Sequence, residues 1–274
     1  MTTPLKTLTI AGSDTSAAGG MQADLKTFEE FGTYGMVALT CIVTMDPKDW
    51  SHHVNQVDPQ ILKDQLATVF SGGNPSAMKT GMLGDQTTVE IAYHAIKDHN
   101  LKNVVIDPVM ICKGETDVLN PDAANAIRDL LMPLAEVTTP NLFEAGVLSG
   151  LGTLHNVAEM KQAAQKIHEL GAKAVVVKGG KGLQSDEAVD VFYDGEKFEL
   201  LSSKKQATDR NAGAGCTFAA AVVGGLANGL SVGEAVHLAK EFDTAAIQNG
   251  FDLNQFLGPV FHPAYRIQKL GKLV

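Results

Sequence analysis

Short apolar runs alternate along the chain with longer segments in which apolar residues recur every three or four positions. The short runs are typical of buried strands and lie at 5–11, 37–44, 76–79, 104–106, 137–139 and 173–178. The longer segments have helical spacing and lie at 21–31, 59–70, 87–99, 121–131, 156–170, 216–228 and 231–249. Residues 189–193 and 197–201, joined across Asp194-Gly195, predict a hairpin. This alternation predicts one α/β domain over residues 1–274, with helices on both faces of a mostly parallel central sheet.

Several helix starts carry their own polar signals. Asp58, followed by proline, is a typical N-cap. Thr87 and Glu90 have the spacing of a capping box, which places a helix start at Thr87. By contrast, residues 45–57 predict an irregular segment, and residues 251–274 predict no defined element.

The composition is that of an ordinary globular protein, with 45% hydrophobic and 19% charged residues in 274. A formal net charge of −9 without a Lys/Arg cluster argues against general nucleic-acid binding. No segment is apolar for long enough to span a membrane, and the N-terminus lacks the pattern of a signal peptide. Three widely spaced cysteines form neither a disulfide framework nor a zinc pattern, so we expect a reducing, cytoplasmic location.

The segment 211–217 combines a glycine turn with the start of a small-residue helix. Gly213 and Gly215 permit close backbone approach, and a helix N-terminus directs N–H groups and a positive dipole end at one point. This arrangement suits an anion such as a transferring phosphoryl group. Cys216 lies in the first helical turn, where the dipole favours thiolate. A buried cysteine in a Gly/Ala helix junction explains this stretch equally well.

Two further sets of polar residues follow predicted strands. Asp14 lies in a small polar loop at the carboxyl end of the first strand, where open α/β sheets bind ligands. Asn141 and Glu144 open a helix one turn apart, a spacing that suits oxygen groups around Mg²⁺ near phosphates. Turn capping by Asp14 and helix capping by Asn141 and Glu144 are the alternative interpretations.

Seven short motifs occur in one order along almost the whole chain. They lie at 11–14, 22–28, 79–83, 107–110, 139–145, 177–180 and 213–217. Together they resemble the ribokinase-like superfamily of small-molecule kinases, in the branch of hydroxymethylpyrimidine (phosphate) kinases and pyridoxal kinases. The resemblance implies a three-layer α/β/α ribokinase-like fold and phosphoryl transfer from ATP with Mg²⁺. It also suggests a homodimer.

The resemblance assigns roles to particular positions. Residues 213–216 form the anion hole, with Gly213 and Gly215 in the turn and Cys216 as the base. The acceptor pocket takes Asp14, Gly12, Gly20, Met45, Met82 and Val109. The nucleotide side takes Lys178, Gly180, Asn141, Asp107 and Ala214, and Glu144 and Asp107 organise the metal. Core filling is an equally good explanation for Met82.

Two departures from the branch bear on the acceptor. Met45 occupies the position where pyrimidine kinases usually carry glutamine, and a thioether cannot replace the paired donor and acceptor of an amide. Cys112 stands in the loop after residues 107–110, where the branch usually has alanine. A thiol adds reversibly to an aldehyde, so Cys112 could clamp pyridoxal as a hemithioacetal, as in a group of bacterial pyridoxal kinases with a second, lid cysteine. The alternative is an incidental small residue.

The sequence therefore favours a kinase for pyridoxal, with pyridoxine and pyridoxamine as further acceptors. Hydroxymethylpyrimidine kinase is the nearest alternative. A cysteine hydrolase with Cys216 as nucleophile would need a histidine base, for which His237 is a candidate, and a binding module without turnover is a third class. His52 and His53 are interpreted as surface residues.

Overall fold

A computed structural model of the chain describes residues 3–110 and 120–271. In these residues nine strands form one sheet in the order β3-β2-β1-β4-β5-β6-β7-β8-β9. The strands are β1 (Lys6–Asp14), β2 (Tyr34–Met45), β3 (His52–Gln56), β4 (Ala77–Thr80), β5 (Val104–Ile106), β6 (Val137–Thr138), β7 (Ala174–Lys178), β8 (Glu187–Tyr193) and β9 (Phe198–Lys204). The strands from β2 to β7 in this order run parallel, and antiparallel pairing adds β3 at one edge and β8 and β9 at the other.

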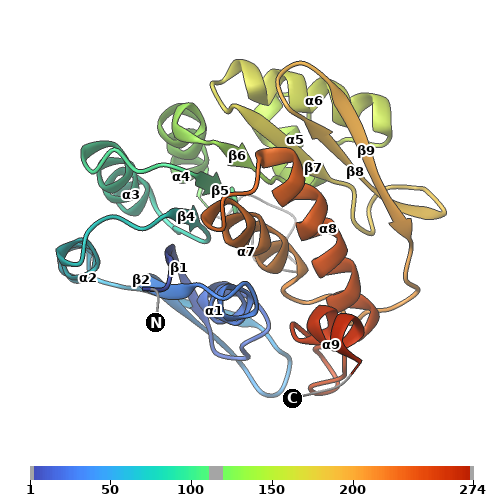
Figure 1. The fold of residues 1–274 in the computed structure, drawn as a ribbon, viewed down its shortest axis with the longest axis horizontal. Coiled ribbons are helices and arrows are strands. Elements are labelled where there is room, and N and C mark those ends of the chain that lie inside the picture. Colours follow the sequence, from blue (N-terminus) through green and yellow to red (C-terminus); the bar gives the residue numbers. More distant parts are fainter. Residues whose placement is uncertain (1–2, 111–119, 272–274) are drawn as a thin grey trace.

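Helices cover both faces of this sheet (Figure 1). One hydrophobic core packs α2 (Pro59–Ser71), α3 (Gln86–Asp98), α4 (Pro121–Ala126), α5 (Leu142–Ser149) and α6 (Val157–Glu169) against one face. A second core packs α1 (Gly20–Glu30), α7 (Ala214–Ala227) and α8 (Val232–Gln248) against the other. A π-helical turn (Ile127–Leu131) and a 3-10 turn (Met132–Leu134) follow α4, and α9 (Ala264–Leu270) contacts α8. The expected three-layer α/β/α architecture is confirmed.

The central strands are apolar in continuous runs because both of their faces are buried. In β5, Val104 and Ile106 belong to the first core, whereas Val105 between them belongs to the second. Neighbouring residues therefore fill different cores, and the period-two alternation of a half-exposed strand is absent. In the described part of the chain, no helix combines the length and hydrophobicity needed to cross a bilayer.

The helix starts follow the polar signals with one exception. Asp58 caps α2 by accepting from the backbone N–H of Gln60. α3 begins at Gln86, one residue before the expected start near Thr87. The expected Thr87–Glu90 capping box is wrong, because the Asp85 carboxylate is the N-cap and accepts from the backbone N–H of Thr88. Asp is the better N-cap residue, so the N-cap lies at Asp85, two residues before Thr87.

Two segments without a predicted element do contain one. Residues 45–57 include β3, which pairs with the end of β2 so that His52 lies opposite Met45. β3 lies at the sheet edge and is largely solvent-accessible, so its polar sequence has no apolar signature. The segment 251–274 includes α9 and a backbone bridge between Ala212 and Pro259.

Candidate active site

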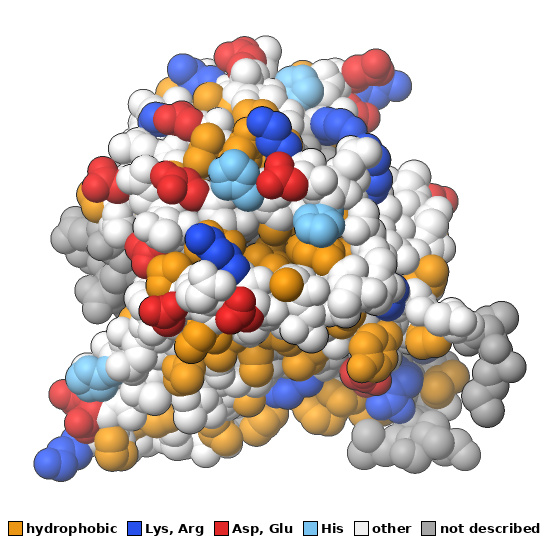
Figure 2. Space-filling model, turned by 90° about the vertical axis from the view of Figure 1, so that its left-hand side faces the viewer, with side chains coloured by type: hydrophobic (Ala, Val, Ile, Leu, Met, Phe, Trp, Pro, Cys, Tyr) orange, Lys and Arg blue, Asp and Glu red, His pale blue; other side chains and the backbone are white. Residues whose placement is uncertain are grey.

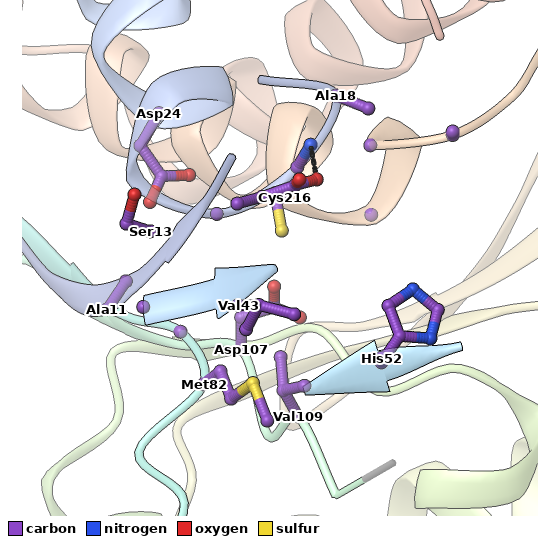
Figure 3. Close-up of a pocket in the computed structure, with 18 of the residues that line it drawn as sticks. Ala11, Ser13, Ala18, Asp24, Val43, His52, Met82, Asp107, Val109 and Cys216 are labelled. Atoms are coloured by element: carbon purple, nitrogen blue, oxygen red, sulfur yellow. Dashed lines mark hydrogen bonds between the residues drawn. The ribbon is translucent and has the colours of Figure 1, made fainter. Parts of the chain in front are cut away.

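A cavity of about 260 Å³ lies at the carboxyl ends of the central strands, where the N-terminus of α7 faces the sheet (Figure 3). Its walls come from the ends of β1, β2, β4 and β5, the turn before α7, and residues near the C-terminus of the chain. Figure 3 shows the sulfur of Cys216 directed into this space, with Val43, Met82, Asp107 and Val109 on the opposite wall. The cavity therefore joins the predicted thiol to the predicted strand-end residues.

The glycine turn before α7 adopts a conformation that requires glycine. Gly213 has φ +85°, and a Cβ built on it would overlap the carbonyl oxygen of Ala18. α7 begins at Ala214 rather than at Cys216, so the thiol lies within the first turn of the helix. A Cβ on Gly215 would lie 3.3 Å from the Lys178 Nζ atom. Both glycines therefore allow the turn to approach neighbouring backbone and the lysine closely.

Burial keeps the Cys216 thiol in its protonated form. Burial raises the pKa of Cys216 to about 11, and although Lys79 and the Gly20 N–H lower it, Asp24 and Asp107 add to the rise. The expectation that the helix N-terminus favours thiolate is therefore wrong, because desolvation of the buried thiol outweighs the helix dipole. A role as base requires the thiol to lose its proton during turnover.

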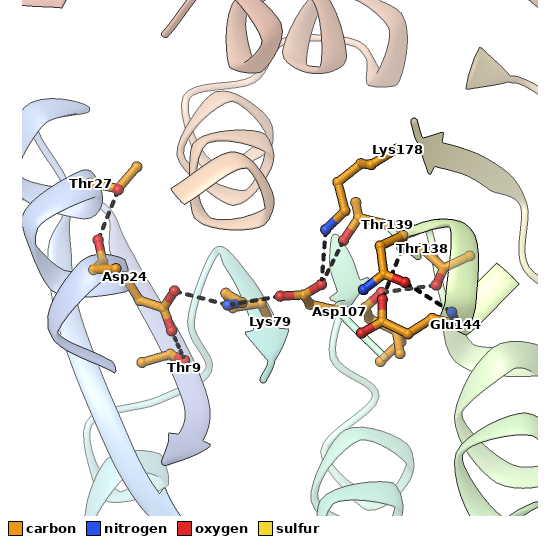
Figure 4. A network of polar contacts seen from close by, with 12 residues as sticks. Thr9, Asp24, Thr27, Lys79, Asp107, Thr138, Thr139, Glu144 and Lys178 are labelled. Atoms are coloured by element: carbon orange, nitrogen blue, oxygen red, sulfur yellow. Dashed lines mark hydrogen bonds and ion pairs between the residues drawn. The ribbon is translucent and has the colours of Figure 1, made fainter. Parts of the chain in front are cut away.

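Alternating charges cross the floor of the cavity (Figure 4). The Lys79 ammonium lies 2.8 Å from Asp24 Oδ1 and 3.7 Å from Asp107 Oδ2, and Lys178 Nζ lies 3.4 Å from Asp107 Oδ1. The Thr9 hydroxyl donates to the second oxygen of Asp24 at 2.7 Å. We call Asp24, Lys79, Asp107 and Lys178 the buried charge chain.

The two lysines of the buried charge chain stay charged despite their environment. Burial opposes the charge on Lys79, but Asp24, Cys216 and Asp107 raise its pKa above the usual value. The same balance, with Asp107, Glu144 and Cys216 as partners, raises the pKa of Lys178. Each ammonium is stabilised by carboxylates rather than by water.

Glu144 combines a capping role with a perturbed carboxyl group. Its Oε2 accepts from the Asn141 N–H at 2.8 Å, and Asn141 Oδ1 accepts from the Glu144 N–H at 2.9 Å, so the capping box is complete. Burial raises the pKa of Glu144 to about 7, and Asp107 adds to the rise, whereas Lys178 and the N–H groups of Asn141 and Met110 oppose it. Glu144 and Asn141 also line the cavity, so capping does not remove them from the site.

A second cavity of about 390 Å³ adjoins the first on the side of Lys178. Asn141, Lys178 and Gly215 line both cavities, and Gly180 and Ala214 line the second. A third hollow, lined by lysines 181, 204, 205 and 240, continues from Gly180. The first and second cavities thus meet at the N-terminus of α7.

The structure brings nearly all the predicted site residues together. The first cavity includes all six predicted acceptor residues: Gly12, Asp14, Gly20, Met45, Met82 and Val109. Cys112 lies outside the described residues. The Asp14 carboxylate caps its own loop, accepting from the Gly19 N–H at 2.8 Å and from the Ser16 N–H and hydroxyl at 2.8 and 2.6 Å.

Several cavity residues had no assigned role in the sequence. Asp24 and Lys79 lie within the motifs at 22–28 and 79–83, which contained the signal. His52 lines the cavity opposite Met45, so its interpretation as a surface residue is wrong. Leu257 comes from the segment that predicted no element, and no pattern marked it.

The histidines do not support a hydrolytic thiol. His237 is half-exposed and pairs with Glu199 at 3.0 Å, away from the cavity residues. His262 is buried and bonded to the Thr217 hydroxyl at 3.0 Å. Among the residues that the structure describes, no hydrogen bond joins Cys216 to a histidine, so the proposed base His237 lies in the wrong place.

Comparison with known proteins gives one consistent family. Residues 14–261 match the phosphomethylpyrimidine kinase family. A pyridoxine kinase of Bacillus subtilis is 54% identical over 96% of this chain and 98% of its own length. The structure of the pyridoxal kinase from Staphylococcus aureus in complex with AMP-PCP and pyridoxal has a TM-score of 0.92 at 50% identity, over 96% of this chain and 95% of that chain.

A hydroxymethylpyrimidine/phosphomethylpyrimidine kinase of Staphylococcus aureus is 37% identical over 97% of this chain and 96% of its own length. These matches extend over nearly the whole chain, and the solved structure shares its three-layer fold, as the ribokinase-like resemblance implied. The chain belongs to the phosphomethylpyrimidine kinase family.

Proposed function

We propose that this chain is an ATP- and Mg²⁺-dependent kinase that phosphorylates the hydroxymethyl group of pyridoxal, with pyridoxine and pyridoxamine as further acceptors. The observation that carries the proposal is the junction of two cavities at Asn141, Lys178 and Gly215. An acceptor in the first cavity and a nucleotide in the second would meet at the N-terminus of α7. The similarity to pyridoxine and pyridoxal kinases supports the same reaction.

The acceptor cavity suits a flat, mostly apolar ring. Val43, Met45, Met82 and Val109 supply apolar walls, and the His52 imidazole is the polar group among them at the β3 edge. Met45 offers no amide to an aminopyrimidine. Hydroxymethylpyrimidine kinase remains the second candidate because relatives with that name share 37% identity over most of the chain.

The donor side is polar and basic. Lys178 lines the junction, and the third hollow beyond Gly180 adds Lys204 and Lys205 as well as Lys181 and Lys240, which are paired with Asp209 and Asp190. The described residues contain no cluster of three His, Cys, Asp or Glu side chains that could hold a metal. Glu144, Asp107 and Asn141 nevertheless fit a Mg²⁺ ion that keeps phosphate and water ligands, because this ion commonly takes only one or two carboxylates from the protein. When bound, Mg²⁺ would neutralise charge that develops on the phosphates.

In the proposed reaction the hydroxymethyl oxygen forms a bond to the γ-phosphorus while the β–γ bridging P–O bond breaks. ADP leaves. Cys216 is a thiol at rest, so it would first release its own proton to solvent and then, as a thiolate, accept the proton of the acceptor hydroxyl. The N–H groups of residues 213–216 would hold the transferring group, and Lys178 would lie at the phosphate end. Because the transition state of phosphoryl transfer is loose, this positioning contributes more than early proton removal.

We also propose a homodimer. β2 and α2 carry exposed apolar side chains, with Tyr34, Ile42 and Ile61 exposed to 59%, 42% and 55%. Figure 2 shows the side of the molecule where these elements lie, and apolar side chains gather there between charged ones. Exposed apolar groups of this kind mark protein–protein contacts when they are contiguous. A cytoplasmic location fits free thiols that work in reduced form.

The first prediction concerns the acceptor. With saturating MgATP, pyridoxal should exceed hydroxymethylpyrimidine in kcat/KM by about tenfold or more, which is about 1.4 kcal/mol of transition-state binding. ADP release measured with pyridoxal, pyridoxine and hydroxymethylpyrimidine side by side tests this. A tenfold preference for hydroxymethylpyrimidine would reverse the assignment.

The second prediction separates the metal role of Glu144 from its capping role. Glu144→Gln should lower kcat strongly, because the charge that organises Mg²⁺ is lost. Glu234 provides the matched control, since it closes the capping box of α8 outside both cavities. Glu234→Gln should leave kcat unchanged, and equal effects of the two substitutions would return Glu144 to a capping role alone.

The pKa of Glu144 adds a pH test with a definite sign. Because its pKa rises from 4.5 to about 7 on folding, the unfolding free energy of the ligand-free protein should fall as pH rises from 4.5 through 7. Wild-type kcat/KM should fall below pH 7 as Glu144 becomes protonated. Glu144→Gln should remove its contribution to the stability slope, which urea unfolding across this range measures.

The third prediction concerns the two thiols. Cys216→Ala should lower kcat/KM for pyridoxal and pyridoxine alike, because the anion hole and proton removal serve every acceptor. Cys112→Ala should lower pyridoxal turnover far more than pyridoxine turnover, because only an aldehyde forms the hemithioacetal and gains orientation from it. Equal losses on both substrates would mean that Cys112 acts through its loop, and no loss would make it incidental.

The fourth prediction tests the assembly. Sedimentation velocity should show a dimer, and Ile42→Glu should shift it towards monomer by placing a charge in the contact. Leu200→Glu is the matched control, since Leu200 is 46% exposed on β9 at the other end of the sheet. A wild-type monomer at micromolar concentration would contradict the proposal.

A further inference from the structure

The segment 249–263, between α8 and α9, is hydrogen-bonded to the turn that precedes α7. The Ala212 N–H donates to Gly258 O at 3.0 Å, and the Val260 N–H donates to Ala212 O at 3.1 Å. Ala212 is the residue directly before Gly213, and it is 3% exposed. The backbone entering the turn is therefore fixed by two hydrogen bonds in a buried place.

The same segment also reaches the residue directly after Cys216. The Thr217 hydroxyl and His262 Nε2 lie 3.0 Å apart, and the two residues are 0% and 3% exposed. Burial, with a contribution from Lys26, lowers the pKa of His262 to about 4, so the imidazole is neutral near pH 7. The bond joins two neutral groups that are largely shielded from water.

The use of the Thr217 hydroxyl is unusual for a buried helical threonine. Such a hydroxyl commonly bonds the carbonyl one turn earlier, as Thr27 does with Ala23 O at 2.8 Å in α1. In α7 the carbonyl one turn before Thr217 belongs to Gly213 and accepts the Thr217 N–H at 2.9 Å. The Thr217 hydroxyl instead ties the first turn of α7 to His262.

We propose that His262 is a positioning residue for phosphoryl transfer, which acts through Thr217 to hold residues 213–216 in place. The backbone bridge at Ala212 fixes one side of these residues and the His262–Thr217 bond fixes the other. Neither Thr217 nor His262 lines the acceptor or donor cavity, so neither is a catalytic residue. This proposal rests on the proposed role of residues 213–216 as the anion hole.

The consequence is a loss of turnover without a loss of binding. A small displacement of preorganised N–H donors weakens their contact with charge that develops in the transition state. Neither Thr217 nor His262 lines the acceptor cavity, so KM should not follow kcat. The effect should be the same for pyridoxal and pyridoxine, because the phosphoryl group is common to both reactions.

The experiment compares Thr217→Val, Thr217→Ser, His262→Leu and the double variant Thr217→Val/His262→Leu. We expect Thr217→Val and His262→Leu each to lower kcat by roughly tenfold to a hundredfold, with KM for both substrates within about twofold of wild type. Thr217→Ser, which keeps the hydroxyl, should restore most of the rate. The double variant should be no slower than the slower single variant, because both changes remove one bond.

Thr27→Val is the matched control, since it removes a buried helical threonine hydroxyl that bonds only within its own helix. Its kcat should stay near the wild-type value. Quenching of Trp50, the single tryptophan of the chain, measures pyridoxal binding independently of turnover, because Trp50 packs with Leu257 of the cavity wall. Thermal unfolding confirms that each variant is folded, and Thr217→Val keeps the test available if His262→Leu does not fold.

An unchanged kcat in folded Thr217→Val would overturn the proposal, as would an equal loss in Thr27→Val or losses that multiply in the double variant. Gly215→Ala separates this failure from failure of the anion hole itself. Its Cβ would enter the space beside Lys178 within the anion hole. If Gly215→Ala keeps the wild-type kcat, both the anion-hole role of residues 213–216 and the positioning role of His262 are contradicted. If Gly215→Ala is slow and Thr217→Val is not, only the positioning role of His262 is contradicted.

Discussion

The buried charge chain is the constraint on which the rest of the site depends. Lys79 is fully buried at the centre of the sheet, and an ammonium group there is tolerable only when carboxylates and hydrogen bonds replace water. Asp24 on α1 and Asp107 after β5 provide these partners, and Asp107 also contacts Lys178 at the end of β7. Breaking such a pair typically costs about 3–5 kcal/mol. The buried charge chain therefore fixes the relative positions of elements from both halves of the sequence.

This constraint also explains why the two cavities meet where they do. Asp24 and Lys79 form part of the acceptor cavity, and Lys178 belongs to both cavities. Strands β1, β4, β5, β6 and β7 run parallel to one another, so their carboxyl ends lie at the same edge of the sheet. Charges at strand ends far apart in sequence are thus brought together, and α7 closes the space above them.

The fold could be predicted largely from the sequence because its signals are local. Apolar runs such as 104–106, helical spacing and caps such as Asp58 depend on neighbours in the chain. The edge strand β3 was missed because a largely exposed strand needs no apolar residues and so shows no alternating apolar pattern. The N-cap of α3 was misplaced by two residues because Asp85 competes with Thr87 for the same role.

Most of the site residues that could be predicted from the sequence lie in the motifs. Gly213, Asp107 and Glu144 lie in such motifs and do line the cavities. His52 and Leu257 did not stand out, because their roles follow from which segments pack over the strand ends. The pKa of Cys216 was misjudged for a related reason: the helix dipole is a local property, whereas burial beside Asp24 and Asp107 depends on the whole fold.

The balance of charge in the site indicates what must hold the transferring phosphoryl group. In the buried charge chain two ammonium groups face two carboxylates, so their charges largely cancel before any nucleotide arrives. Glu144 has a pKa of about 7, and the Cys216 thiol is protonated, so neither adds a full charge near neutral pH. Among the described residues that line the junction, the other fixed source of positive potential is the N-terminus of α7. The N–H dipoles of a helix N-terminus stabilise a negative charge only when that charge lies close to them and in line with the N–H bonds. Turnover should therefore depend on how rigidly residues 213–216 are held, and the segment that binds both Ala212 and Thr217 provides that rigidity from outside the site.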